Sequence, residues 1–195
     1  MHRISATLAA LAIACSVPAF AQDQATDPQA ERIAAARAAV KGLGEGLKEK
    51  LVAAMKAGGP VAALDVCKVD APKVTAERSS ASGMDVGRTA LKVRNPGNAP
   101  DDFEKRVMEK FVADLNSGAD AMKLEHAEVV ERDGKKVFRY MKPIMTAGTP
   151  CLACHGSALT PDVSAKIKEL YPSDQATGFA AGDMRGAFTV KKVLE

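Results

Sequence analysis

The five residues Cys151-Leu152-Ala153-Cys154-His155 constrain this chain more than any other stretch of its sequence. Two thiols three positions apart lie on one side of a helical turn, where both can add to the vinyl groups of a single porphyrin. The histidine that follows is then placed to bind the iron from the proximal side. The pattern therefore predicts one covalent haem c, with Cys151 and Cys154 as thioether residues and His155 as an iron ligand. Gly156 follows, and we expect its missing side chain to avoid crowding the ring edge.

Three other uses of this motif compete with the haem interpretation. A thioredoxin-like redox pair sits early in a βαβ pattern, but only residues 156–195 follow this one. A structural zinc site needs further ligands, and the sequence has no second C-x-x-C and no H-x-x-x-H. A disulfide between Cys151 and Cys154 would close a very small loop. The haem interpretation is favoured over all three.

Residues 1–21 have the pattern of a cleaved export signal. A short basic start is followed by an apolar run over residues 4–17 and by the cleavage pattern Ala19-Phe20-Ala21. Cys15 raises the alternative of a lipid anchor, but Ala12-Ile13-Ala14 before it matches the lipidation pattern poorly. We therefore expect a soluble periplasmic protein with a flexible start at residues 22–26 and a single domain over residues 27–195.

The charge balance argues against two classes of partner. The formal net charge is +3 and falls to +2 when Arg3 is removed with the signal, which is too balanced for a nucleic-acid or anionic-membrane surface. The chain has no Trp and only two Tyr, so it offers no platform for stacking bases. After residue 21 no stretch is apolar enough to span a membrane.

Cys67 is left over once the haem motif has taken two cysteines. An unpaired thiol is unusual in an exported protein, because that compartment is oxidising. Cys67 lies at helical spacing with Leu64 and Ala71, so it belongs to the apolar face of its helix. Two interpretations stay open: a small buried hydrophobe, or a second ligand to the haem iron.

The pattern of the whole chain predicts an α+β fold. Asp27-Pro28 begins a long N-terminal helix that Ala57-Gly58-Gly59 ends, and Pro60 begins a second helix, followed by a loop at 79–83. A strand at 86–93 and a helix from 100 to 115 come next. A hairpin turns at Asp133-Gly134 between strands 124–132 and 135–145, and a helix at 160–170 and a strand at 186–194 follow the motif. We expect an antiparallel sheet of four to five strands with flanking helices on one face.

Several stretches together resemble the bacterial PAS-like haem c domains, which occur as exported single domains and as sensory domains of histidine kinases. The matching segments are Asp65-Val66-Cys67, Ala71-Pro72, residues 88–96, Arg139-Tyr140-Met141-Lys142-Pro143-Ile144, the haem motif with Gly156, and residues 182–190. The resemblance implies a PAS-like fold and an iron held by the motif histidine and a cysteine from the helical N-terminal part. Cys67 is the residue here that matches this cysteine.

Other side chains compete for roles at the haem. His126 is the only other histidine after the signal, and Met141 and Met145 lie close to the motif in sequence, so each is an alternative iron ligand. Arg139, Lys142 and Arg185 are candidate partners of the haem propionates, with ordinary surface charge as the alternative.

Two classes of function follow from this site. A thiolate ligand favours Fe(III), and its loss on reduction would open the iron, which suits a redox or small-gas sensor with a signalling partner. The alternative is a periplasmic electron carrier with a redox partner and no signalling role. An enzyme is not expected, because no distal His/Arg pair is evident.

Overall fold

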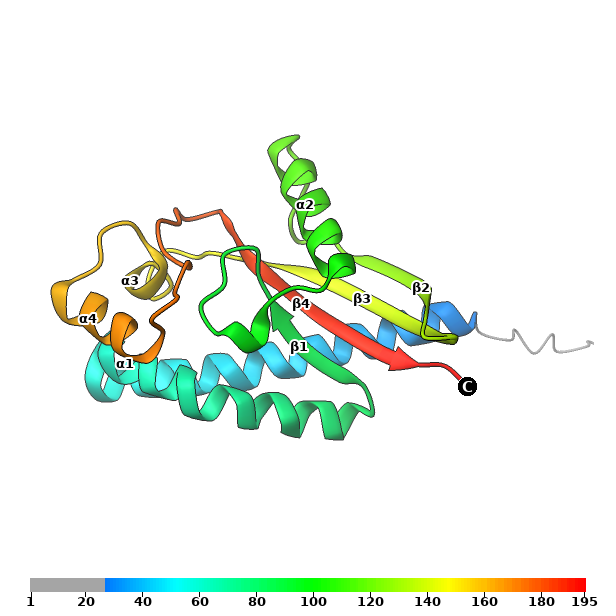
Figure 1. Cartoon of the computed structure of the whole chain (residues 1–195), viewed down its shortest axis with the longest axis horizontal. Helices are drawn as coiled ribbons and strands as arrows, with labels where there is room; N and C mark the ends of the chain where they lie inside the picture. Colours follow the sequence, from blue (N-terminus) through cyan, green and yellow to red (C-terminus); the bar gives the residue numbers. More distant parts are fainter. Residues whose placement is uncertain (1–26) are drawn as a thin grey trace, which may run out of the picture.

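The computed structural model describes residues 27–195, so the predicted export signal and the segment 22–26 lie outside the described residues. Nine elements follow one another in this range, and a four-stranded antiparallel sheet of order β1-β4-β3-β2 forms the centre of the fold (Figure 1). The elements are α1 (Pro28–Ser82), β1 (Asp85–Thr89), the 3-10 turn η1 (Pro96–Asn98), α2 (Asp102–Asn116), β2 (His126–Arg132), β3 (Lys135–Met145), α3 (Leu152–His155), α4 (Pro161–Leu170) and β4 (Met184–Val193). The predicted α+β class and the four-stranded sheet are confirmed.

Helix α1 consists of two arms folded back on each other. Its start is the predicted one, since the Asp27 carboxylate accepts a hydrogen bond from the Gln29 N–H at 2.9 Å. The backbone leaves helical geometry at Gly58 and Gly59, and Pro60 begins the second arm, as predicted. We call residues 28–57 the first arm and residues 60–82 the second arm; they lie side by side in Figure 1.

The arms lie close together because glycine replaces a side chain at their contact. A Cβ at Gly46 would stand 3.1 Å from the Val74 Cγ1 of the second arm, and one at Gly44 would stand 3.2 Å from the Phe188 ring of β4. The helical cost of these glycines, roughly 1 kcal/mol each relative to Ala, is thus offset by close packing. The sequence indicated a bend or a close approach here, and the structure shows the close approach.

Two boundaries differ from the predictions. The predicted loop at 79–83 is helical to Ser82, because the Ser79 hydroxyl bonds both the N–H and the carbonyl of Val86 and so ties the helix end to β1. The strand predicted over 86–93 ends at Thr89. Beyond it, the Val93 carbonyl accepts a hydrogen bond from the Gln175 N–H at 2.8 Å, so this segment pairs with a later loop instead of the sheet.

The sheet carries helices on both faces, not on one as expected. Phe138, Tyr140 and Val190 are fully buried against the first arm of α1. The alternate residues Met141 and Ala187 pack against α2 on the other face. Strand alternation makes both faces apolar at the centre of the sheet, which the separate strand patterns did not reveal.

A buried ionic cluster fastens the start of α2 to the sheet. Asp101 and Glu104 form the capping box of α2. The Arg139 guanidinium, only 2% exposed, pairs with Asp101 at 3.0 Å and with Glu104 at 3.1 Å. The Thr189 hydroxyl donates to Glu104 at 2.8 Å. This cluster occupies the α2 face of the sheet.

This cluster makes the free energy of unfolding depend on pH. Burial alone would raise the pKa of Asp101, but the Glu104 N–H and the Arg139 guanidinium lower it to about 2. A depressed pKa stabilises the fold above the unfolded-state value near 4, and this contribution disappears as the pH falls through about 2. Asp101→Asn, which can still cap the helix, should lose about 2 kcal/mol of unfolding free energy at pH 6 and almost none at pH 2. Urea unfolding at both pH values measures this, with exposed Asp102→Asn as control; an equal loss at both would contradict it.

Candidate haem site

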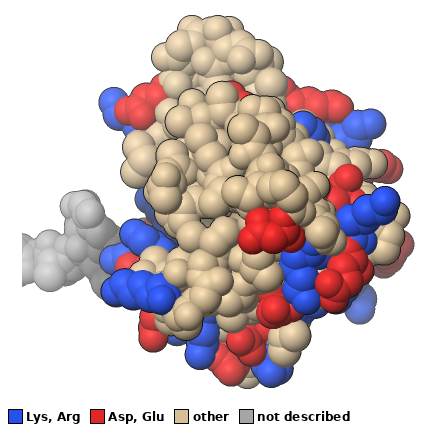
Figure 2. All heavy atoms as spheres, turned by 90° about the vertical axis from the view of Figure 1, so that its left-hand side faces the viewer, with Lys and Arg blue, Asp and Glu red and all other residues tan. Residues whose placement is uncertain are grey.

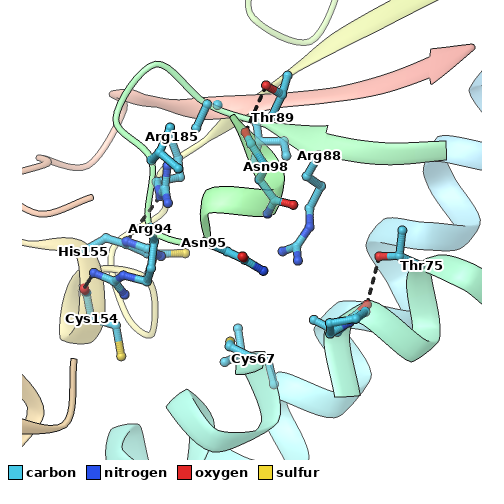
Figure 3. A pocket seen from close by; sticks show the side chains of 18 of the residues that line it. Cys67, Thr75, Arg88, Thr89, Arg94, Asn95, Asn98, Cys154, His155 and Arg185 are labelled. Carbon is cyan, nitrogen blue, oxygen red and sulfur yellow. Dashed lines mark hydrogen bonds between the residues drawn. The ribbon is translucent and has the colours of Figure 1, made fainter. Parts of the chain in front are cut away.

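One cavity of about 840 Å³ opens between the second arm of α1, β1, the segment 93–98, the end of β3 and the motif at α3 (Figure 3). Its wall includes most of the residues that the sequence singled out for the haem. Those residues are Cys67, Met145, Cys151, Cys154, His155 and Arg185. The topology therefore gathers side chains from three distant parts of the chain, around residues 67, 145–155 and 185, at one space.

The motif forms a single helical turn at the edge of this cavity. The His155 N–H donates to the Cys151 carbonyl at 3.0 Å, and the Gly156 N–H donates to the Leu152 carbonyl at 3.0 Å. A Cβ at Gly156 would stand 2.6 Å from that Leu152 carbonyl oxygen. The turn itself therefore requires a glycine at this position.

The His155 ring is oriented by the loop that follows α4. Its Nδ1 lies 2.8 Å from the Ala176 carbonyl oxygen and 3.2 Å from the Arg185 Nε. Since two acceptors at 2.8 Å would repel, Nδ1 carries the proton and donates to Ala176, and the Arg185 contact is packing of a cation beside the ring. Nε2 is then left with a free lone pair, which is the form that binds a metal.

The surroundings of His155 keep it neutral. Burial lowers the pKa of the imidazole to about 3, with help from the cations of Arg185 and Arg94. Proton competition for the Nε2 lone pair is therefore weak at any ordinary pH. The Phe179 ring stands edge-on at 6.3 Å and closes the other side.

Arg94 is the central structural link of this region. Its buried guanidinium pairs with Asp174 at 2.9 Å and donates to the carbonyls of Cys154 at 2.8 Å and Ala176 at 3.0 Å. A planar guanidinium offers five N–H donors in a rigid fork, so it can grip the Asp174 carboxylate with two nitrogens and still donate to the two carbonyls. Arg94 therefore fixes the end of the motif against the loop that orients His155.

Removing Arg94 should cost far more than removing an exposed arginine. Arg94→Leu leaves the Asp174 carboxylate buried without its partner, so we expect the free energy of unfolding to fall by about 3–5 kcal/mol. Arg132→Leu, which breaks the exposed pair with Asp101 at 3.7 Å, should cost under about 1 kcal/mol. Denaturant unfolding of both variants makes the comparison. Equal losses would show that Arg94 is not a structural link.

Cys67 reaches the cavity from the second arm and faces it from the side opposite the motif (Figure 3). Cys67 is exposed because it borders this open space. Burial raises the pKa of the Cys67 thiol, and the cations of Arg88 and Arg94 act in the opposite direction. Of the two interpretations left open by the sequence, the thiol lies at the cavity rather than in an apolar core.

The other residues that the sequence offered as iron ligands or propionate partners differ in whether they reach the cavity. Met145 lines the cavity. Met141 is fully buried under α2, and His126 bonds Glu128 at 3.1 Å beside the Phe103 ring. Arg139 belongs to the ionic cluster under α2.

Lys142 is also engaged elsewhere. It donates to the Met122 carbonyl at 2.9 Å and to the Leu124 carbonyl at 3.3 Å. Of the three candidate propionate partners, the structure thus brings Arg185 alone to the cavity.

Several cavity residues had no assigned role in the sequence. They are Arg88, Arg94, Asn95, Asn98 and Thr146. For Arg88 a signal existed: period-two alternation places it on the same face of β1 as the buried Val86. For Thr146 and the asparagines the sequence contained no comparable signal.

Within residues 27–195, no three His, Cys, Asp or Glu side chains are grouped so that they could hold a metal ion. The same part of the chain contains no helix long and apolar enough to cross a membrane.

Comparison with known proteins places the chain in a family. The model of the Tll0287-like family matches residues 18–192, and the chain belongs to that family. Among solved structures, the cyanobacterial haem protein Tll0287 matches with a TM-score of 0.62 and 26% identity. The match covers 87% of this chain and 98% of that one. No curated protein matches.

Proposed function

We propose that the chain is an exported protein that binds one covalent haem c in this cavity and acts in the periplasm as a redox or small-gas sensor. The observation that carries the proposal is the position of the C-x-x-C-H motif and Cys67 on opposite sides of one cavity (Figure 3). Membership of a family whose solved relative is a haem protein supports it.

The residues present fit the group. Two thiols, an imidazole with a free Nε2 and a third thiol are the donors that a covalently held iron porphyrin uses. The volume of about 840 Å³ lies within the roughly 300–1,000 Å³ of cofactor sites. The Thr146 hydroxyl, on the cavity wall, is buried without a hydrogen-bond partner among the described residues. A buried hydroxyl without a partner is costly, so a bound polar group there would stabilise it.

Each side chain then has a defined task. The S–H bonds of Cys151 and Cys154 would add across the two vinyl C=C bonds, so that sulfur bonds one carbon and hydrogen the other. The Nε2 of His155 and the Sγ of Cys67 would hold the iron. Haem bound there would supply an iron that changes oxidation state and can take a small gas when one axial position is vacant.

The position of Cys67 supports the sensor function. Its helical arm follows the first arm through the turn at Gly58 and Gly59, and it packs on α4 through Leu64, Val163 and Ile167. A thiolate that binds or leaves would therefore act on a helix that runs along the sheet (Figure 1). The proposal includes no catalytic reaction.

One observation favours the alternative, electron transfer without signalling. The end of the molecule that carries α3 presents a broad area without Lys, Arg, Asp or Glu (Figure 2). The segment 143–161, which contains the motif, has none of these residues. An uncharged surface at the motif would suit the brief docking of a redox partner.

A redox titration with gas exposure separates the two functions. For a sensor we expect a low midpoint potential, with carbon monoxide or nitric oxide binding only to the reduced protein. A high midpoint potential with fast electron self-exchange and no gas binding would favour the carrier and contradict the sensor. Met145→Leu is the matched control, because this side chain shares the cavity wall without a proposed bond to iron.

A further inference from the structure

Arg88 is a charged side chain of the cavity wall without a partner among the described residues. Its half-buried guanidinium makes no hydrogen bond and no ion pair within residues 27–195, and it points into the cavity (Figure 3). Burial lowers the pKa of Arg88. Burying a cation without a counter-charge costs free energy, so an anion bound at this position would stabilise the protein.

The other two arginines of the cavity are already used. Arg94 is neutralised by Asp174. Arg185 donates to the Lys92 carbonyl at 3.0 Å and packs beside His155 and the Phe179 ring. Arg88 therefore differs from both in having its donors available.

Two amides stand near it with spare donors. The Asn95 side-chain oxygen accepts from the Gly97 N–H at 3.1 Å, which leaves its NH₂ without a partner in the described part of the chain. The Asn98 side chain has no hydrogen bond there either, while its backbone carbonyl accepts from the Thr89 hydroxyl at 3.2 Å. Both asparagines line the cavity with Arg88 (Figure 3). N–H donors converging with a guanidinium are suited to a carboxylate.

The position of this group matches the chemistry of haem. Thioether bonds at Cys151 and Cys154 would fix the vinyl edge of the ring at α3, and the propionates occupy the other edge. Figure 3 shows Arg88 across the cavity from Cys154, whereas Arg94 and Arg185 lie on the His155 side. We propose that Arg88, with Asn95 and Asn98, forms a carboxylate-binding end of the cavity that holds a haem propionate. This inference depends on the proposed haem binding.

Arg88→Gln in the holoprotein tests the inference, with Arg106→Gln on the exposed face of α2 as the control. The propionate-bending band in resonance Raman spectra should shift in Arg88→Gln, shift less in Arg88→Lys and stay unchanged in Arg106→Gln. The midpoint potential should fall in Arg88→Gln, since a lost cation disfavours Fe(II). The ferric EPR signal of the axial ligands should stay the same.

Two results would overturn the inference. One is an unchanged propionate band in Arg88→Gln. The other is a changed axial-ligand EPR signal with an unchanged band, which would make Arg88 a partner of the Cys67 sulfur instead. If Arg88→Gln does not accumulate, Asn95→Ala and Asn98→Ala provide the same Raman comparison, and no shift in either would count against the site. A wild-type protein without haem would refute the proposed function instead, so the two failures are distinguishable.

Discussion

Exported protein with Cys151→Ala and Cys154→Ala together should contain no haem that survives denaturation. Both thioether bonds would come from these two sulfurs, so their removal abolishes covalent attachment completely. Denaturing electrophoresis with haem staining, and the intact mass of the purified chain, measure the loss.

The matched control is Cys67→Ala, which removes the third cysteine of the described chain from the same cavity. It should keep the covalent haem and the full gain in mass. Covalent haem in the double variant, or its loss in Cys67→Ala alone, would contradict the assignment of the thioether residues.

Cys67→Ala should instead change the midpoint potential and the gas binding of the haem iron. An anionic sulfur ligand stabilises Fe(III), so its loss should raise the midpoint potential. We expect a rise of at least a tenth of the roughly 0.8 V over which axial ligands tune haem proteins. The variant should also bind carbon monoxide faster on reduction, because no protein ligand has to leave first. Potentiometry and flash photolysis measure the two effects.

Met145→Leu is again the control, since this thioether lies on the same wall and is the remaining rival at the cavity. It should leave the potential unchanged. A large change in Met145→Leu, with none in Cys67→Ala, would assign the distal position to the methionine.

Much of the local structure could be predicted because its signals are local. Asp27-Pro28, Gly58-Gly59-Pro60 and Asp133-Gly134 determine helix starts, a helix break and a hairpin through their own backbone preferences. The haem motif is likewise contained in one helical turn.

The site could be predicted only where its residues carry their chemistry in a short motif. Arg139 is a candidate propionate partner because its guanidinium suits a carboxylate, but alternation along β3 turns it toward α2, while Phe138 and Tyr140 face α1. The packing of α1 and α2 decides on which face of the sheet the cavity lies. The sequence of a single strand does not contain this information.

Arg88 and Arg94 show the converse case: both line the cavity, but the sequence assigned neither of them a role. Both lie in a segment that reads as ordinary strand and loop. Arg88 faces a cavity that distant parts of the chain enclose, and the role of Arg94 arises from contacts with such parts. For Arg94 these parts are the motif at Cys154 and the loop at Asp174 and Ala176. Contacts between residues this far apart in sequence can be identified only once the fold is known.

The ferric EPR spectrum of the purified wild-type protein is the most direct test of the account. A covalent haem held by His155 and Cys67 predicts a low-spin signal of the imidazole/thiolate type, which disappears in Cys67→Ala. A low-spin signal that is identical in wild type and Cys67→Ala would contradict the account, as would a high-spin signal in the wild type.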